Sequence, residues 1–360
     1  MNIDTLGRGL KDGTAALIIS ETNRLYFTEF AATDGFLIVT NKGAKFITDS
    51  RYIEAAAAEA KGCEVELMKS GKEFADQLIG TIKALGGKTV LVETSRLSVA
   101  DAKAYEKLLS EGKLRLVLND KLDGMIAELR KVKSEEEKAK LQRAQRIAEK
   151  AFKTILSMIK PGVREREIAA ALDFEMRKAG ATAVSFETIV VTGKNSSKPH
   201  GVPGDTKVKK GDFVTIDFGA LAAGYHSDTT RTVAVGSVTP KMANVYDTVL
   251  KAQKAGVAAL KPGLRAFDAD KTCRDIIKAA EYGEYFGHGT GHGVGVEIHE
   301  LPNLSPGTKK SVILQPGNVV TVEPGIYIPG EFGVRIEDML MITPDGAHNF
   351  ASLPKKLIVL

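Results

Sequence analysis

The sequence predicts two domains, an α/β domain followed by a larger α+β domain whose two halves are related by an internal pseudo-twofold repeat. Short buried strands alternate with helices over the first third of the chain, and a KPG-containing segment occurs twice in the rest. Each copy of that segment leads into a strand-like run that carries acidic residues. A chain of 360 residues is long for one domain. We place the domains at 1–126 and 127–360.

The first domain is expected to be a layered α/β structure of modest size. Short apolar runs rich in β-branched residues predict its strands, and the segments near 51–60, 72–85 and 98–110 are predicted helices between them. Gly86–Thr89 reads GGKT but lacks the earlier glycine of a phosphate-binding loop, so we expect it to lead into a strand. The predicted strands read AALIIS, DGFLIVT, AKFITD, CEVELM, KTVLVE and RLVL.

The second domain is expected to begin with a long amphipathic helix over 134–159, because apolar residues recur at helical spacing from Leu141 onward. Ser134 and Glu137 fit a capping box at its start, and the segment near 122–133 is expected to be a short linker. Antiparallel strands and hairpins are predicted after it. These strands contain TIVVTG, DFVTIDFG, TRTVAVG, NVVTVEPG and DMLMIT, and further helices are predicted at 240–260 and 265–281.

The internal repeat is visible in two segments that share the KPG turn. IKPGVREREIAAAL begins at Ile159 and LKPGLRAFDADKTC begins at Leu260, and roughly sixty residues after each comes a strand-like run with an acid. Two copies are too few for a solenoid, but they suit two halves that face each other. The alternative is a coincidence of common turn and strand patterns.

Two matched pairs of carboxylates are the most informative feature of the second domain. Asp217 and Asp228 lie in GDFVTIDFGALAAGYHSDTTRT, and Glu323 and Glu337 lie in GNVVTVEPGIYIPGEFGVRIED. Any one of these acids alone is better explained as a cap or an ion-pair partner. Four acids drawn together would repel one another unless cations neutralised them, so the matched pairs predict a two-metal site.

Histidines between and before the acidic pairs add nitrogen groups to the predicted site. His292 stands between two glycines, which let a ligand approach closely, although a buried histidine bonded to backbone is a competing explanation. One imidazole among carboxylates suits Mn²⁺, Co²⁺, Fe²⁺ or Zn²⁺. Loop residues His200 and His299 could donate hydrogen bonds to a developing oxyanion, whereas His226 and His348 are expected at the surface. The absence of an HExxH motif excludes a single-zinc protease of that type.

Composition excludes several other classes of protein. The contents of 43% hydrophobic and 26% charged residues are ordinary for a soluble globular protein. The net charge of +5 is spread along the chain without a dense basic block, so no nucleic-acid partner is expected. The two cysteines, Cys63 and Cys273, fit a reducing compartment. We find no signal-peptide pattern and no membrane-spanning apolar stretch, and therefore expect a cytoplasmic protein.

Four motifs resemble those of one peptidase family. DFG-x7-SDTTRT, HGTGHGVG-x3-HE, TVEPGIY and GVRIED are similar to the motifs of the metallopeptidases of the aminopeptidase P and prolidase group. TDGFLIVT and TDSRY look like the creatinase-type N-terminal domain of the same group. The resemblance spans essentially the whole chain. It implies that residues 127–360 adopt the pita-bread fold, whose internal pseudo-symmetry agrees with the repeat described above.

The resemblance implies a role for each candidate site residue. Two divalent ions, manganese first and cobalt, iron or zinc as alternatives, would be bridged by Asp228 and Glu337. Asp217 would bind one ion, and His292 and Glu323 would bind the other. Water activated by the metals would attack the scissile carbonyl carbon. Glu323 would move the water's proton to the leaving nitrogen, and His299 and His200 would contact the substrate. His288 would be a further active-site residue, and Arg335 would orient the carboxylates.

The implied activity is hydrolysis of the bond between an N-terminal residue and a following proline. We favour an aminopeptidase P-like enzyme that acts on peptides with proline at the second position, with an Xaa-Pro dipeptidase, or prolidase, as the alternative. A non-catalytic binding module with the pita-bread fold is a hypothesis of another class. All five ligand positions carry residues that can bind metal, which favours an active enzyme. The resemblance also implies a homodimer.

Overall fold

The computed structural model describes residues 2–360, which form two compact units. The first unit extends up to Leu129, and the second runs from Arg130 to Leu360. Every helix within residues 2–360 is too short or too polar to cross a lipid bilayer. Each unit is described separately below.

The first unit is built on a mixed six-stranded sheet with the strand order β4-β3-β2-β1-β5-β6. The β1–β2 and β2–β3 pairs are antiparallel, and the other three pairs are parallel. The elements are α1 (Asn2–Gly9), β1 (Thr14–Ile18), α2 (Glu21–Thr28), β2 (Phe36–Thr40), β3 (Gly43–Thr48), α3 (Ile53–Glu59), β4 (Glu64–Leu67), α4 (Gly71–Ala84), β5 (Thr89–Val92), α5 (Val99–Glu111), β6 (Arg115–Val117) and α6 (Lys121–Lys131).

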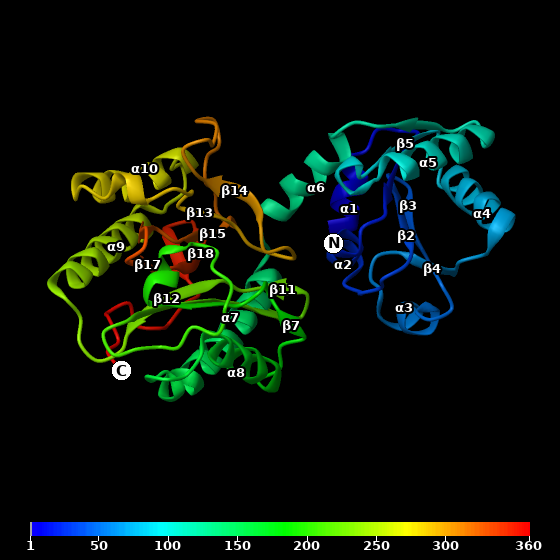
Figure 1. The fold of residues 1–360 in the computed structure, drawn as a ribbon. Coiled ribbons are helices and arrows are strands. Elements are labelled where there is room, and N and C mark those ends of the chain that lie inside the picture. The colour runs from blue at the N-terminus through cyan, green and yellow to red at the C-terminus, as the bar shows by residue number, and fades with distance from the viewer. Residues whose placement is uncertain (1) are drawn as a thin grey trace. The chain divides into compact units, whose positions relative to one another are not determined.

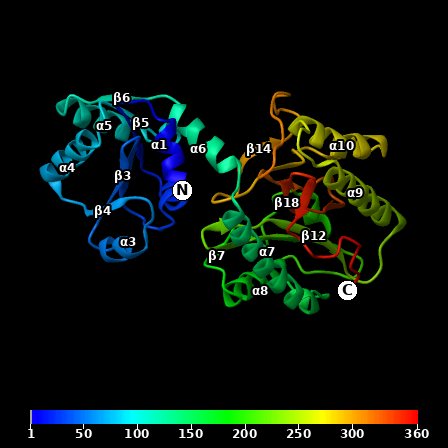
Figure 2. The ribbon, with the colours of Figure 1, turned by 180° about the vertical axis from the view of Figure 1, so that it is seen from behind.

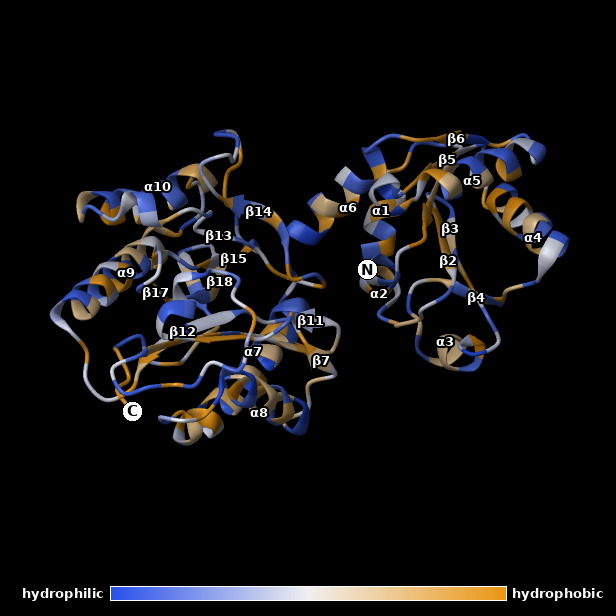
Figure 3. Ribbon diagram, viewed as in Figure 1, coloured by the Kyte–Doolittle hydropathy of each residue, from blue (hydrophilic) through white to orange (hydrophobic). Residues whose placement is uncertain are grey.

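Both faces of this sheet are covered, which explains why the central strands β1, β2 and β5 are almost continuously apolar. Leu17 and Ile38 share a hydrophobic cluster with Leu78 and Ile82 of α4, while the buried side chain of Leu6 lies on α1, which contacts β2. Figure 3 shows the hydrophobic residues along β2 and β3. The six strands and three helices expected here are confirmed, although the sequence patterns did not predict α1 and α2.

The expectation of a linker near 122–133 is wrong, because most of this segment is the helix α6. Leu122 and Ile126 stand four residues apart on one face of that helix and are 0% and 2% exposed. Burial of this apolar pair stabilises the helix. The charged residues around the pair made the helical pattern hard to recognise in the sequence.

The second unit repeats one order of elements, helix–helix–strands–hairpin–strand, in its two halves. Figures 1 and 2 show α7 and α8 on one side of the central strands and α9 and α10 on the other. The first half comprises α7 (Glu135–Ile155), α8 (Glu165–Lys178), β7 (Ala183–Val184), β8 (Ile189–Thr192), β9 (Phe213–Phe218), β10 (Ala220–Ala222), β11 (Tyr225–His226) and β12 (Thr229–Ala234). The second half comprises α9 (Pro240–Ala259), α10 (Ala266–Ala279), β13 (Gly291–Gly293), β14 (Glu300–Leu304), β15 (Val319–Val322), β16 (Gly325–Ile328), β17 (Phe332–Arg335), β18 (Asp338–Thr343) and β19 (Gly346–Asn349).

Strand pairing repeats in the same way. The sheet β12-β9-β8 in the first half corresponds to the β18-β15-β13 part of the sheet β14-β13-β15-β18-β19 in the second. The hairpins β10–β11 and β16–β17 occupy equivalent places in the order. The capping box at the start of α7 is confirmed, because Ser134 Oγ accepts a hydrogen bond from Glu137 N at 3.2 Å and Glu137 Oε2 accepts one from Ser134 N at 2.8 Å.

Each half packs its helices on its own strands. The stacked rings of Phe152 on α7 and Phe218 on β9, 5.1 Å apart, lie in the core of the first half. In the core of the second half, Cys273 and Ile277 of α10 pack near Val320 and Val322 of β15. The halves therefore present their strands to each other across the interior, and the acidic residues lie at the ends of these strands.

Candidate metal centre

The register of the strands gives the first-half acids their positions. Asp217 is the penultimate residue of β9 and lies opposite Thr230 on β12. Asp228 immediately precedes β12, so the chain leaves β9, forms the short β10–β11 hairpin and returns beside its starting point. The expectation that a hairpin returns Asp228 to the neighbourhood of Asp217 agrees with this geometry.

The second-half acids occupy equivalent positions. Glu323 follows the last residue of β15, and Glu337 immediately precedes β18. Backbone hydrogen bonds fix both: Glu323 N donates to Thr290 O at 2.8 Å, and Glu337 N donates to Thr230 O at 3.1 Å. The second of these bonds joins the two halves and brings Glu337 next to the strand that follows Asp228.

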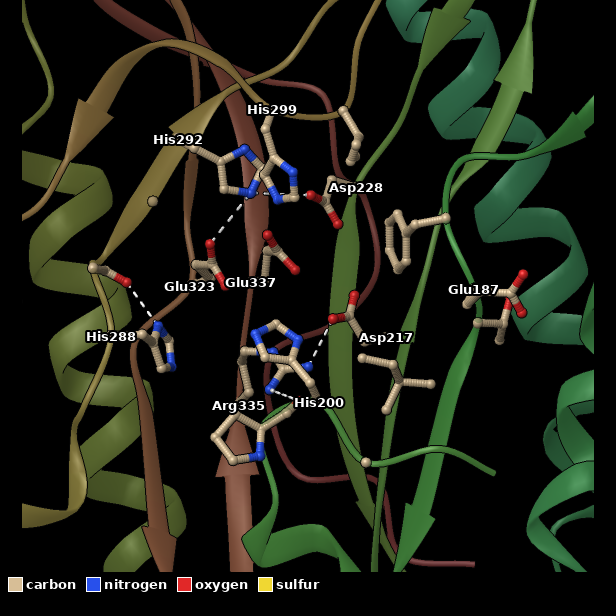
Figure 4. A pocket seen from close by; sticks show the side chains of 18 of the residues that line it. Glu187, His200, Asp217, Asp228, His288, His292, His299, Glu323, Arg335 and Glu337 are labelled. Carbon is tan, nitrogen blue, oxygen red and sulfur yellow. Dashed lines mark hydrogen bonds and ion pairs between the residues drawn. The ribbon is translucent and has the colours of Figure 1, made fainter. Parts of the chain in front are cut away.

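One cavity of about 600 Å³ gathers all the candidate site residues. Figure 4 shows that the carboxylates of Asp217, Asp228, Glu323 and Glu337 point toward one another, with His292 beside them. The cavity is also lined by the other candidates, His200, His288, His299 and Arg335. The structure therefore brings together every residue that the sequence predicted for the site.

His292 directs a free nitrogen lone pair at the acids. Its Nδ1 lies 3.0 Å from Gly293 O and must donate there, so the neutral ring carries its lone pair on Nε2. Nε2 lies 3.5 Å from Asp228 Oδ2 and 3.4 Å from Glu323 Oε1. Burial lowers the pKa of His292 to about 4, so the ring is neutral at neutral pH. Candidate ligand atoms of Asp228, His292 and Glu337 all lie within 4.8 Å of one another.

Two buried carboxylate oxygens at this site accept no hydrogen bond from residues 2–360. Asp217 Oδ2 accepts from Arg335 Nη2 at 2.7 Å, but Asp217 Oδ1 is buried without a partner among the described residues. Glu337 Oε2 accepts from Thr230 Oγ1 at 2.7 Å, but its Oε1 is likewise buried and unpaired within residues 2–360. Buried acceptors left unpaired are costly, and a cation is the partner that such oxygens accept.

Burial and neighbouring negative charges disfavour the ionised form of three of these acids. Burial, followed by the charges of Asp217 and Glu323, raises the pKa of Asp228 well above its usual range. Burial and then the charge of Asp228 do the same to the pKa of Glu337. Burial also raises the pKa of Glu323 to about 8, against the opposing effect of Arg335. The donor set of four carboxylates and one neutral imidazole fits divalent metal ions.

Arg335 connects this cluster to residues behind it. Its buried guanidinium donates to Asp217, to Tyr327 Oη at 2.8 Å and to Thr230 Oγ1 at 3.0 Å. Burial opposes its charge, but Tyr327, Asp217 and Glu323 together raise its pKa well above the usual range. Tyr327 Oη also lies 2.9 Å from Nε2 of His288, whose Nδ1 is 2.7 Å from Gly289 O. His288 is thereby held through both ring nitrogens, and it lines the cavity.

The other two candidate histidines lie at the exposed side of the cavity. His200 and His299 are both exposed, and the ring of His299 packs edge-on against His292 with centroids 4.4 Å apart. The expectation that His226 is a surface residue is wrong: it is half-buried on β11, and its Nδ1 has no partner among the described residues. Burial lowers its pKa.

Several residues of the site were not predicted from the sequence. Tyr327 lies in the TVEPGIY motif, which was the available signal, but its contact with Arg335 depends on the β16–β17 hairpin. The apolar walls come from short loops and strand ends, at positions that no motif specifies. They are lined by Phe186, Ile189, Val202, Pro203 and Ile298, and Glu187 stands exposed at the edge.

A buried group of acids and one neutral imidazole lies between the two halves of the second unit and lines a cavity with further histidines. This arrangement defines a metal-dependent hydrolase. The chain belongs to metallopeptidase family M24, whose family model matches residues 139–344. The creatinase/prolidase N-terminal domain model matches residues 11–132. The predicted resemblance and the predicted fold, a creatinase-like α/β domain followed by a pita-bread domain with internal repeat, are thereby confirmed.

Similar proteins cover the whole chain. A Xaa-Pro dipeptidase of Pyrococcus furiosus is 45% identical over 343 residues, which is 95% of this chain and 94% of that protein. The solved structure of a Xaa-Pro dipeptidase from Bacillus anthracis has a TM-score of 0.92 at 41% identity and covers 100% of this chain and 98% of its own. An X-Pro aminopeptidase structure from Thermotoga maritima has a TM-score of 0.91 at 35% identity, covering 99% and 100%.

Proposed function

We propose that this protein is a cytoplasmic Xaa-Pro dipeptidase that depends on two divalent metal ions, and that manganese is the preferred metal. The sequence led us to favour longer peptides, with the dipeptidase as the alternative. The relatives support the alternative better, because curated and structural relatives of nearly full length are named Xaa-Pro dipeptidase or prolidase. A homodimer remains a prediction from the resemblance, and light scattering would test it.

The observation that carries the proposal is the pair of unpaired carboxylate oxygens beside an imidazole lone pair. We assign Asp217, Asp228, His292, Glu323 and Glu337 as the residues that would hold the two ions. The unpaired Oδ1 of Asp217 and Oε1 of Glu337 support this assignment, as does the Nε2 lone pair of His292. Bound divalent ions would lower the pKa of water toward neutrality and polarise the peptide carbonyl.

Around such ions, the residues of this chain would handle the proton and the developing charge. Glu323 accepts a hydrogen bond from Thr321 Oγ1 at 3.3 Å, and otherwise faces the cavity, where it can take the proton of the attacking water. The same carboxyl group would deliver the proton to the leaving proline nitrogen. His299 and His200 line the cavity and would donate hydrogen bonds to the carbonyl oxygen as it becomes negative.

The supporting residues hold this arrangement in place. Arg335 fixes one oxygen of Asp217 and leaves the other directed at the cavity. His288 is locked by Tyr327 and Gly289, which makes it a wall of the cavity rather than a ligand in this assignment. The apolar side of the cavity, with Phe186, Ile189 and Ile298 among its lining residues, offers surface for side chains of an apolar dipeptide.

A comparison of three substrates tests the proposal. Purified, Mn²⁺-loaded protein should hydrolyse Met-Pro, should cleave Met-Pro-Ala poorly, and should leave Met-Ala intact. Efficient cleavage of the tripeptide would favour the aminopeptidase that the Thermotoga maritima relative is named for. Failure to cleave either proline peptide, with the metal shown to be bound, would refute the proposal.

A further inference from the structure

A buried carboxylate outside the cavity holds the neck of the loop that carries His200. This loop follows β8, passes through a short 3₁₀ helix (Gly193–Ser197) and continues to Gly204. Glu165, the first residue of α8, lies against both ends of the loop and is 0% exposed. It is not among the residues that line the cavity.

Both oxygens of Glu165 are used, and they reach both sides of the loop. Oε1 accepts from Thr192 N at 2.8 Å, where the chain enters the loop, and Oε2 accepts from Gly204 N at 3.0 Å, where the chain leaves it. Asn195 Nδ2 donates to both oxygens, at 3.1 and 3.3 Å. One buried carboxylate therefore closes the loop at its base.

The tip of the loop depends on that base. His200 is exposed at the tip, and Val202, two residues on, is 85% exposed and has little packing of its own. On the cavity side, the tip is contacted by Arg335, whose Nη1 donates to Pro199 O at 3.3 Å. Ser196 Oγ provides a further attachment, because it accepts a hydrogen bond from Gly333 N at 2.9 Å. Glu165 and these contacts thus fix the backbone on both sides of His200.

A simple helix-capping role does not account for Glu165. An acid in the first turn of a helix is favourable in general. The backbone N–H of Arg164 at this N-terminus is, however, bonded by Glu167 Oε2 at 2.8 Å. The carboxylate of Glu165 takes no part in that cap and accepts hydrogen bonds from the loop instead.

The second half of the unit has a comparable device on its second helix. Asp270 of α10 is 2% exposed, and its Oδ1 accepts from both N and Oγ1 of Thr290 at 3.0 Å. Thr290 lies between His288 and His292 in sequence. Arg274, paired with Asp270 at 2.8 Å, also donates to His288 O at 2.7 Å. Each half therefore places a buried acid of its second helix beneath a loop that carries site histidines.

We propose that Glu165 is a positioning residue for His200: it fixes the neck of the 193–204 loop so that the imidazole at the tip meets the substrate carbonyl. The proposal rests on the function proposed above, in which His200 contacts the substrate. Glu165 itself touches neither substrate nor metal. Most of its effect on hydrolysis should consequently pass through His200.

Glu165→Gln is the direct test, because the side chain keeps its shape but turns one acceptor into a donor that faces other donors. In Mn²⁺-loaded full-length protein we expect kcat/KM for Met-Pro to fall about 10- to 100-fold, the loss typical of a misplaced catalytic group. Metal content should stay unchanged. In a His200→Ala background the same substitution should change kcat/KM less than about twofold.

A matched control stands two residues away on the same helix. Glu167 is also an acid of the first turn, but it is exposed and bonds Arg164 rather than the loop. Glu167→Gln should leave kcat/KM within about twofold of the wild type. Should Glu165→Gln fold poorly, Asn195→Ala removes one donor to Glu165 and should give a smaller loss that also disappears in the His200→Ala background.

Amide hydrogen exchange separates this proposal from the proposed function, because it needs no activity. Glu165→Gln should speed exchange in residues 193–206 and leave the β9 residues 213–218 unchanged. Unchanged exchange in the loop would overturn the proposal, as would a loss of kcat/KM that is equally large with and without His200. If the wild type cleaves no proline peptide, the proposed function fails while the exchange result still decides whether Glu165 fixes the loop.

Discussion

At the scale of single residues, the chemistry of this protein depends on buried oxygen atoms that accept no hydrogen bond from residues 2–360. Asp217 and Glu337 each use one carboxylate oxygen in a hydrogen bond and leave the other buried and unpaired within the described chain. His292 adds a lone pair because Gly293 O holds the proton on its other nitrogen. All the residues of this group could be named from the sequence, since they stand in long motifs. Their support from Thr230 and Tyr327 could not, because those contacts join distant segments.

Removing one of the assigned metal ligands should abolish metal binding without unfolding the protein. In Asp228→Asn or Glu337→Gln, a neutral amide replaces a carboxylate whose charge is disfavoured by burial and by its acidic neighbours. We expect loss of bound metal by elemental analysis and at least about a 1,000-fold loss of kcat/KM, because the metal ions supply the activated water. The melting temperature of the metal-free protein should hold or rise. Full metal occupancy in either variant would contradict the assignment of these two acids as metal ligands.

The raised pKa of Glu323 makes a prediction about pH for the metal-free protein. Its folded pKa is about 8 and its ordinary value is 4.5, so the folded state keeps a proton that the unfolded state releases between these values. The free energy of unfolding should therefore decrease as pH rises from about 5 to 8, by up to about 1.4 kcal/mol per pH unit from this group. Thermal melts at several pH values measure this slope.

A matched variant isolates the contribution of that one carboxyl group. Glu323→Gln cannot titrate, so its metal-free form should lose less stability over the same pH range than the wild type. Equal slopes for the two proteins would show that Glu323 does not hold a proton in the folded, metal-free state.

At the scale of elements, the acids are positioned by strand ends rather than by loops. Asp228 and Glu337 each immediately precede a strand, and Asp217 and Glu323 lie at the ends of the strands paired with these. The long strands and helices were predictable, since apolar runs and helical spacing persist over several residues. Strands of two or three residues, such as β11 and β13, were not, because their existence depends on the partner across the sheet.

A glycine in β13 tests how closely the elements must approach. A Cβ at Gly291 would lie 2.0 Å from Thr321 O on β15, so Gly291→Ala should push β13 away from its neighbour and displace His292. We expect a loss of about 1–3 kcal/mol in the free energy of unfolding and weaker metal binding. Gly287→Ala is the control, since nothing lies within 4 Å of its Cβ position. Denaturant unfolding and calorimetric metal titration measure both effects, and equal stability of the two variants would contradict the steric account.

At the scale of the whole molecule, the metal centre belongs to one of the two units. Every candidate ligand, and the Arg335, Thr230 and Thr321 side chains that support the ligands, lies within Arg130–Leu360. The two hydrophobic clusters beneath the site lie within the same unit. The division of the chain into two domains was foreseeable from its length and the change of pattern, whereas the helix α6 before the second unit was not.

A shortened chain tests this localisation. A protein of residues 130–360 with a native-like circular dichroism spectrum should bind Mn²⁺ with an affinity within about tenfold of the full chain, because the ligands and their supports are all present. Calorimetric titration of both proteins makes the comparison. A folded fragment that binds no metal would show that the first unit is required to assemble the site.

Restoration of activity by metal is the most direct test of the central claim, that the acids and the imidazole of this cavity serve hydrolysis through divalent ions. The initial rate of Met-Pro hydrolysis by chelator-treated protein should be negligible and should rise with added Mn²⁺ until about two ions are bound per chain. A rate that is unaffected by chelation, or a fully loaded protein that leaves Met-Pro intact, would contradict the account.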